Sequence, residues 1–411
     1  MTEHPAILVL NAGSSSLKFA LFGDAQNGEE LSRRCHGEIS GLGIDARFRA
    51  LDGQGVPLLD EAVPAMTHEQ AVGRLLDWLD LREDHGDLAA AGHRVVHGGS
   101  RFCQPVRIDA EILDELRSFI PLAPLHMPHN LAAIDALYRL HPGLTQVACF
   151  DTAFHHNMPL NEQYYALPRK WFERGIRRYG FHGLSYEYIA SVLPKYLGDA
   201  AEGRVVIAHL GHGASLCALH RRRSVATTMG FTPLDGVPMA TRPGQLDPGV
   251  VTFLIRETGL SVKEVDDMLN HRSGLAGLSG GTGNMRELLA DPRPEAAEAV
   301  EYFVHHVHRA IASLAGALGG LDALIFTAGI GENSPLIRER ICDQAAWLGI
   351  ALDKEANAAN QDRISLSGSA VSVWRIPTDE ERVIACHTRR LTDHAKGPAK
   401  EQAPIERGSA T

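Results

Sequence analysis

The amino-acid sequence predicts an α/β protein made of two related halves. Its 411 residues exceed what one compact core usually holds, so two domains are expected. Apolar runs typical of strands alternate with segments of helical spacing. A strand, a glycine turn and a second strand at residues 7–22 recur at residues 205–219, with offsets of 198 from Gly13 to Gly211 and 199 from Leu17 to Leu216. The repeat indicates an internal duplication whose two hairpins could face one nucleotide.

Composition excludes several function classes. Hydrophobic residues make up 44% of the chain and charged residues 22%, as in soluble globular proteins. The formal net charge of -10 argues against nucleic acid or an anionic membrane as the main partner. The first residues lack the pattern of a signal peptide, and no apolar run is long enough to span a membrane, so we expect a cytoplasmic protein. The six scattered cysteines favour reduced thiols.

The first predicted element is a hairpin with a small polar turn. Apolar residues 7–10 lead into the turn, and alternation over residues 17–22 predicts the returning strand. Gly13 allows a ligand to approach the backbone, the neighbouring serines offer donors, and Lys18 adds a positive charge. These features suit a phosphate group. An ordinary serine-rich hairpin would show the same pattern, and the P-loop signature is absent.

The rest of the first half combines further strands with helices. The predicted elements are short strands within 37–60, helices over 71–79, 112–120 and 131–140, and buried strands over 89–96 and 146–150. Arg94 falls near the end of one buried strand, and Asp151 lies directly after the other. Because ligands bind at the carboxyl ends of strands in open α/β sheets, these two residues are candidates for a site.

The second half continues after its own hairpin. The predicted elements are helices over 246–257, 262–269 and 294–318, a loop over 279–283 before a short helix at Met285, strands over 321–327 and 371–376, and a helix near Glu380. A glycine loop is predicted at 328–333, followed by a helix with Ser334 as N-cap and Pro335 at its first position. Free amides there would favour phosphate, although a plain strand-to-helix turn has the same pattern. The tail from His394 is expected to be disordered.

Five short segments carry a resemblance to a known family. They are residues 11–18 (NAGSSSLK), 92–99 (GHRVVHGG), 150–155 (FDTAFH), 179–183 (YGFHG) and 326–333 (FTAGIGEN). In this order they resemble the acetate and propionate kinase family, and the resemblance extends from about residue 6 to residue 393. It implies two duplicated ribonuclease-H-like, actin-like ATPase domains with a nucleotide cleft between them. Their expected bounds are 1–151 with 381–394, and 152–380, followed by a tail at 395–411.

The resemblance implies reversible transfer of the γ-phosphoryl group of ATP to a short carboxylate, acetate first, with Mg²⁺ or Mn²⁺ as cofactor. Acetate is already an anion at neutral pH and needs no general base, so cations should supply the catalysis. Arg94 matches the arginine that holds the carboxylate, and His182 and Arg242 match groups that stabilise the transition state. Asp151 matches an essential aspartate, which we expect to orient an arginine or metal-bound water.

Binding positions carry over in the same way. Asn11 and Glu380 match the magnesium positions, although Glu380 also suits the acidic first turn of a helix. Val96, Leu125, Phe181 and Pro233 match the pocket around the substrate methyl group, although such residues are usually core. The expected nucleotide-binding residues are Ser14, Ser16, Lys18, His209, Leu210, Gly211, His212, Gly213, Asn284, Met285, Arg286, Gly329, Ile330, Gly331, Glu332 and Asn333.

Three positions depart from the family pattern. His212 stands where Asn or Ser is usual, Asn284 where Asp is usual, and Ala240 where Gly is usual. The first two lie in nucleotide segments, so the preferred phosphoryl donor stays open. The family also implies a homodimer and a role in acetyl-CoA biosynthesis.

Alternative functions also stay open. One methylene is worth only about 1–3 kcal/mol of discrimination, so a propionate or butyrate kinase is possible. A non-catalytic actin-like nucleotide-binding protein would need the phosphate loops without Arg94 or Arg242. A zinc hydrolase could use the pairs His126/His129 and His209/His212, and an alcohol or sugar kinase would need Asp151 as a base.

Overall fold

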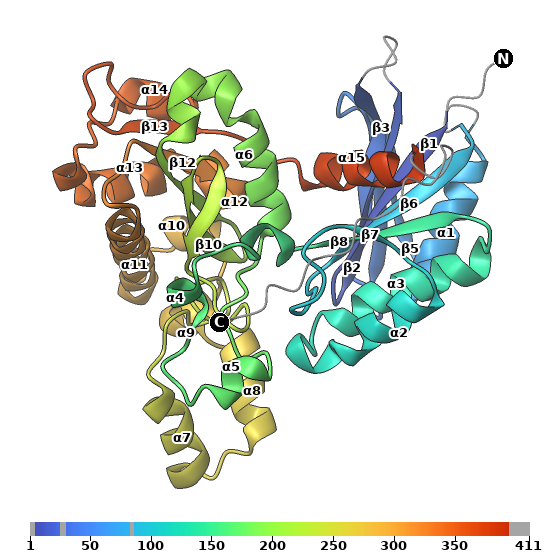
Figure 1. Cartoon of the computed structure of the whole chain (residues 1–411), viewed down its shortest axis with the longest axis horizontal. Coiled ribbons are helices and arrows are strands. Elements are labelled where there is room, and N and C mark those ends of the chain that lie inside the picture. The colour runs from blue at the N-terminus through green and yellow to red at the C-terminus, as the bar shows by residue number, and fades with distance from the viewer. Residues whose placement is uncertain (1–4, 25–29, 83–85, 394–411) are drawn as a thin grey trace, which may run out of the picture.

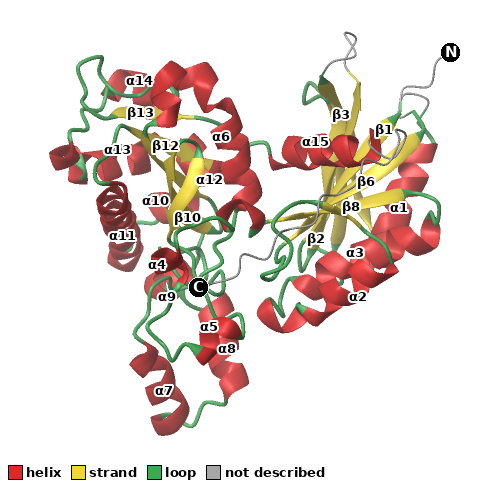
Figure 2. Ribbon diagram, in the orientation of Figure 1, coloured by secondary structure: helices red, strands yellow, loops and turns green. Residues whose placement is uncertain are grey.

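The computed structural model describes residues 5–24, 30–82 and 86–393, so the predicted tail lies outside the described residues. Two β-sheets organise two lobes (Figures 1 and 2). The first sheet has eight strands in the order β5-β4-β3-β2-β1-β6-β8-β7, and the second has five in the order β11-β10-β9-β12-β13. No helix in the described part of the chain combines the length and apolar character needed to cross a bilayer.

The first sheet is covered by helices on both faces. Its strands are β1 (Ala6–Ala12), β2 (Ser16–Asp24), β3 (Leu31–Ser40), β4 (Ala46–Asp52), β5 (Pro57–Val63), β6 (Leu88–Val95), β7 (Val106–Arg107) and β8 (Thr145–Phe150). Leu8 and Leu10 of β1 join one core with α1 (His68–Asp80) and α3 (Met127–Leu140). Ile7 and Val9 join another with α15 (Glu380–Asp393). Burial on both faces explains why residues 6–10 of β1 are all apolar instead of alternating.

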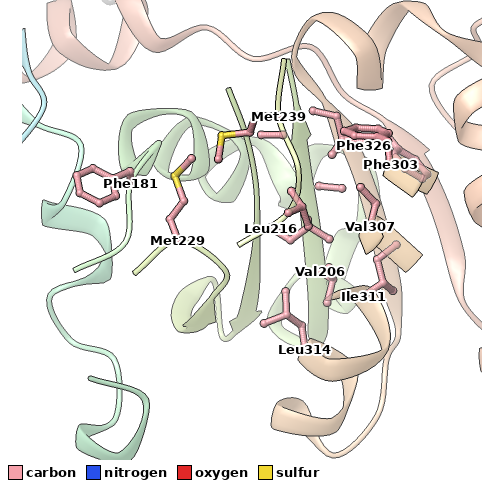
Figure 3. Packing of buried hydrophobic residues seen from close by; sticks show 14 of the residues in the cluster. Phe181, Val206, Leu216, Met229, Met239, Phe303, Val307, Ile311, Leu314 and Phe326 are labelled. Atoms are coloured by element: carbon pink, nitrogen blue, oxygen red, sulfur yellow. The ribbon is translucent and has the colours of Figure 1, made fainter. Parts of the chain in front are cut away.

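The second sheet is also enclosed. Its strands are β9 (Arg204–Leu210), β10 (Ala214–His220), β11 (Arg223–Thr227), β12 (Ala323–Thr327) and β13 (Ser372–Arg375). One face packs on α6 (Gly183–Leu197), and the other on α11 (Pro294–Leu318). Figure 3 shows Val206 and Leu216 of the sheet beside Val307 and Ile311 of α11. This apolar stripe of α11 is the one that its helical spacing predicts.

Shorter helices surround these layers. They are α2 (Ala110–Ser118), α4 (Leu160–Gln163), α5 (Lys170–Glu173), α7 (Pro248–Glu257), α8 (Val262–His271), α9 (Gly274–Ser279), α10 (Met285–Ala290), α12 (Ala328–Asn333), α13 (Pro335–Gln344) and α14 (Lys354–Ala358). Single 3₁₀ turns lie at Ile120–Leu122, Ala153–His155, Gly198–Glu202 and Ala346–Leu348.

The two sheets share one topology, which confirms the predicted duplication. The order β3-β2-β1-β6-β8 corresponds to β11-β10-β9-β12-β13, with the same parallel and antiparallel pairs. The predicted alignment of the returning strands, which matched Leu17 with Leu216, was wrong. Ala12 pairs with Leu17, whereas Leu210 pairs with Ala214, so Leu17 corresponds to Ala214 and not to Leu216. The second turn is one residue shorter than the first. Apolar strands of similar composition can be aligned in more than one register, so the sequence did not reveal this difference.

The predicted glycine loop at 328–333 is also corrected, because these residues form helix α12. Ala328 starts it at φ 64°, a left-handed conformation that is uncommon for a residue with a side chain. The Glu332 carboxylate accepts a hydrogen bond from the Ala328 N–H at 2.7 Å, which stabilises this turn. Ser334 precedes α13 as predicted, but its side chain makes no capping hydrogen bond.

Candidate active site

Arg94 is the centre of a charged cluster at the strand ends of the first sheet. It lies at the end of β6, and its guanidinium makes a two-point contact with Asp151 after β8, at 3.0 Å and 2.5 Å. A third N–H donates to Asn11 Oδ1 of β1 at 3.2 Å. The carboxyl ends of neighbouring parallel strands meet at one sheet edge, which brings together residues distant in sequence.

Burial makes this cluster electrostatically unusual. The Asp151 side chain is only 1% exposed, and Glu380, the first residue of α15, lies 3.9 Å from Arg94. Burial, aided by the Asp151 charge, raises the pKa of Glu380 to about 7 in spite of the opposing Arg94. The two carboxylates in turn raise the pKa of Arg94 despite its burial. Arg94 therefore stays charged, and it lies beside a glutamate carboxyl group that gains a proton near neutral pH.

Arg242 provides a second cation from the other lobe. Its guanidinium lies 3.2 Å from His126 Nε2, at the start of α3, and it donates a long hydrogen bond of 3.5 Å to the Pro233 carbonyl. Burial, with a contribution from Arg94, lowers the pKa of Arg242. Burial and Arg242 lower the pKa of His126 to about 4, so this histidine is neutral at pH 7. The neutral His126 ring accepts a hydrogen bond from the Arg242 guanidinium, and this hydrogen bond connects the two lobes.

His182 and His209 form a stacked pair next to these cations. Their ring centroids are 4.2 Å apart with planes 17° from parallel. His182 precedes α6 in a left-handed conformation with φ 57°. Burial lowers the pKa of His209 to about 3 and holds the pKa of His182 well below its usual value, with neighbouring His209, Arg94 and Arg242 acting in the same direction. Both rings are neutral at physiological pH.

A cavity of about 810 Å³ lies over the turn after β9 and the start of α10 and α12. Its size falls within the range of ligand pockets, roughly 300–1,000 Å³. Eight of the expected nucleotide-binding residues line it. They are Gly211, His212, Asn284, Met285, Arg286, Gly329, Ile330 and Asn333. The structure therefore brings three separate predicted segments to one cavity.

Other predicted nucleotide positions lie elsewhere. His209, Leu210 and Gly331 are buried, and the Glu332 carboxylate accepts from the backbone N–H groups of Ala328 and Thr378. Ser14 and Lys18 are exposed on the opening hairpin, where Lys18 pairs across the strands with Asn11. This hairpin is the counterpart of the turn after β9 in the other sheet.

The residues expected around the substrate methyl group have different degrees of burial. Val96 is 6% exposed and Phe181 is 1% exposed, and both belong to the large core that spans the two sheets. Leu125 and Pro233 are half-buried, beside His126 and within hydrogen-bond reach of Arg242 respectively.

The oxygen donors suit a hard cation. Asn11 Oδ1 and the Glu380 carboxylate lie around Arg94, which is the donor chemistry that Mg²⁺ or Mn²⁺ prefers. A divalent cation would also favour the ionised form of Glu380. The histidine pairs diverge: His129 stacks on His68, and His209 hydrogen-bonds to Ser185. In the described ranges, no three His, Cys, Asp or Glu side chains cluster as a metal site.

The sequence reasoning missed several polar residues that hold the site. Asn130 is 5% exposed; its amide donates to the Ala12 carbonyl at 2.8 Å and its oxygen accepts from the Val96 N–H at 3.0 Å. His68 Nε2 lies 2.6 Å from the Gly13 carbonyl. Ser215 Oγ lies 2.8 Å from His182 Nδ1. A polar residue within an apolar helix face was the available signal for Asn130; nothing local marked the others.

Known proteins resemble this chain in sequence and in fold over most of its length. The sequence pattern of the family described as "Acetokinase family" matches residues 6–386. A Rhodopseudomonas palustris protein named acetate kinase is 53% identical over 391 residues, covering 94% of this chain and 98% of that protein. The crystal structure of Porphyromonas gingivalis acetate kinase has a TM-score of 0.83 at 35% identity, covering 94% and 99% of the chains. That of a propionate kinase from Francisella tularensis has a TM-score of 0.88 at 36% identity, covering 94% and 100%.

Proposed function

The chain belongs to the acetokinase family and is a phosphotransferase that uses ATP, and we propose that its cleft transfers the γ-phosphoryl group reversibly to acetate, giving acetyl phosphate and ADP. The observation that supports this most directly is the position of Arg94. Its guanidinium lies between Asp151, Asn11 and Glu380 at the edge of the first sheet, with Arg242 of the other lobe close enough for the two charges to affect each other.

Arg94 binds the substrate carboxylate in this proposal. A guanidinium has five N–H donors, and three of them contact Asp151 and Asn11, which leaves two for the carboxylate. Asp151 holds the planar fork in one orientation, so the entropy of fixing a long side chain is lost before the substrate arrives. Both Asp151 oxygens are engaged by Arg94, which favours the orienting role over that of a general base.

Arg242 and His182 act on the transferring phosphoryl group. Charge spreads over its equatorial oxygens in the transition state, and fixed donors in a buried site stabilise that charge more effectively than water does. Arg242 brings a cation that burial leaves poorly solvated, and His182 brings a neutral ring. The nucleotide occupies the 810 Å³ cavity, so that its phosphates extend from α12 towards these two side chains.

A magnesium ion, or manganese in its place, would be held by Asn11 and Glu380. Bound there, it would supply positive charge that offsets the negative charge of the phosphates. Chelation with EDTA is therefore expected to abolish turnover, and added Mg²⁺ or Mn²⁺ to restore it. Turnover that persists in EDTA would contradict the metal assignment.

The direct test incubates the protein with ATP, Mg²⁺ and acetate, propionate or butyrate, and traps the acyl phosphate with hydroxylamine. We expect hydroxamate with acetate to form most efficiently. The neighbour named propionate kinase makes propionate the second candidate acceptor. No hydroxamate with any of the acids would refute the proposed reaction and favour a non-catalytic nucleotide-binding protein.

A homodimer in the cytoplasm, supplying acetyl groups for acetyl-CoA biosynthesis, completes the proposal. The exposed helix α7 supports the dimer: none of its residues is buried, and Val250 and Phe253 are 41% and 54% exposed. Apolar surface of this kind often marks subunit interfaces. Light scattering should give twice the mass of the chain, and Phe253→Glu should halve it. A monomeric wild type would contradict the dimer.

A further inference from the structure

A hydrogen-bonded series of two buried hydroxyl groups ends at the imidazole of His182. Ser215 Oγ lies 2.8 Å from His182 Nδ1, and the Tyr186 hydroxyl lies 2.5 Å from the same Ser215 oxygen. Tyr186 and Ser215 are both 0% exposed, so bulk water cannot reach either hydroxyl. Tyr186 belongs to α6, which His182 directly precedes, and Ser215 belongs to β10. The packing of α6 on the second sheet therefore fixes the positions of these hydrogen-bonded side chains.

Two arrangements of hydrogen atoms fit these distances. In the first, Tyr186 donates to Ser215, Ser215 donates to His182 Nδ1, and the ring hydrogen resides on Nε2. In the second, His182 Nδ1 donates to Ser215 and Ser215 donates to Tyr186. Within the described residues, Ser215 is the one hydrogen-bond partner of the Tyr186 hydroxyl. The second arrangement would leave the buried Tyr186 O–H without an acceptor, which is costly, whereas the first gives both hydroxyl hydrogens an acceptor.

We infer that Tyr186 and Ser215 are positioning residues that hold His182 as the neutral tautomer with its hydrogen on Nε2. The catalytic role of this tautomer rests on the proposed function. In that function, His182 presents its Nε2–H donor to the phosphoryl group. The Nε2 atom lies beside the turn after β9, where a Cβ atom on Gly213 would be only 3.1 Å away. A hydrogen there therefore points to the glycine turn next to the nucleotide cavity.

The surroundings keep this donor neutral. The groups that face the ring are His209 of β9, Arg94 of β6, Arg242 of the loop after β11, and His155 after β8. Burial and these groups all lower the pKa of His182. Burial also raises the pKa of Tyr186 well above its usual value, so the phenol keeps the hydrogen that this series requires. His182 can thus donate across the physiological pH range without adding a charge to the site.

Neutron diffraction from a perdeuterated crystal of the whole protein tests the tautomer directly. We expect deuterium on His182 Nε2, none on Nδ1, and the Tyr186 deuterium directed at Ser215. Deuterium on Nδ1 alone, or on both ring nitrogens, would overturn the inference. This readout is independent of activity, so it can fail or succeed whatever substrate the enzyme uses.

Kinetics of Tyr186→Phe provide the second test. The variant keeps the ring volume but removes the hydroxyl that donates to the Ser215 oxygen, so that oxygen can accept from His182 Nδ1 instead. We therefore expect kcat to fall by about two- to tenfold with KM for ATP and acetate unchanged. Tyr179→Phe is the matched control, because the Tyr179 hydroxyl donates to the Gly175 carbonyl and is not connected to His182. It should retain wild-type kcat. An unchanged kcat in Tyr186→Phe, with the fold verified by circular dichroism, would count against the inference.

Discussion

The two sheets have the same strand order, yet their carboxyl-end edges carry different chemistry. The edge of the first sheet presents Asn11, Arg94 and Asp151, which are tied together by charged hydrogen bonds. The corresponding edge of the second presents His209, the glycine turn 211–213 and the start of α12, and it borders the 810 Å³ cavity. The first edge is therefore the charged one, and the second is the one that borders a large cavity.

This difference follows from what each edge is proposed to bind. A small carboxylate offers little surface, so a rigid charged fork must supply its affinity. A nucleotide offers a large surface, so shape, backbone N–H groups and room matter more. Duplication supplies two edges that face one another, and divergence at the strand ends suffices to specialise each one. Variants that affect one edge at a time can test this division.

Removing the charge from the first edge should have the largest effect. Arg94→Ala is expected to lower kcat at least about 100-fold, because the acceptor loses its fixed cation. It also leaves Asp151 buried without a partner, so the free energy of unfolding should fall by about 3–5 kcal/mol. Hydroxamate assays and urea unfolding measure the two effects. Arg47→Ala, which removes an exposed pair with Asp60, is the control, and near-normal turnover in Arg94→Ala would contradict the role of this edge.

Removing a hydrogen-bond acceptor from the second edge should have a smaller effect, and it should change KM for ATP rather than kcat. Glu332→Ala removes the acceptor for the Ala328 and Thr378 N–H groups, which should raise KM for ATP about tenfold by shifting α12. The free energy of unfolding should fall by about 1–3 kcal/mol. KM for acetate should change less than KM for ATP. Glu355→Ala, an exposed first-turn residue of α14, should change none of these values. Equal effects on both substrates would contradict the division.

The contact between the two lobes, from Arg242 to His126, can be examined through the pH dependence of stability. The folded-state pKa of His126 is about 4, below its ordinary 6.5, so between these values the unfolded chain binds more protons and stability falls as pH falls. His126→Gln keeps an acceptor for Arg242 but cannot be protonated. Relative to wild type, it should gain about 1–3 kcal/mol at pH 4 compared with pH 8. The exposed His305→Gln is the control, and parallel pH profiles of wild type and His126→Gln would refute the prediction.

The smallest effect is expected from a charge placed on the nucleotide side. Asn284 caps α10 by accepting from the Arg286 N–H at 3.0 Å, and aspartate caps helices equally well. Asn284→Asp should therefore keep the thermal stability but raise KM for ATP about two- to fivefold through repulsion from the phosphates. Added salt should reduce the difference. A lower KM for ATP would show that the cavity accommodates the phosphates away from this residue.

The sequence by itself determined the elements and the residue types at their ends. Strand β1 and helix α11 follow from apolar spacing, which is a local property of the chain. Arg94 and Asp151 could be identified as candidates because Arg94 lies near the end of one predicted buried strand and Asp151 directly follows another. The duplication was also visible, but not the one-residue difference between the two turns, because apolar strands of similar composition align in more than one register.

The tertiary structure alone decided which polar groups meet. The contact between His126 and Arg242 joins residues 116 positions apart, and Glu332 bonds to Thr378 across 46 positions. Strand pairing and helix packing create these distances, so no local pattern encodes them. The same applies to the Ser215 and Tyr186 hydroxyls beside His182. Hydrogen bonds are short-ranged and directional, and therefore their partners are defined only once the sheets and helices have packed.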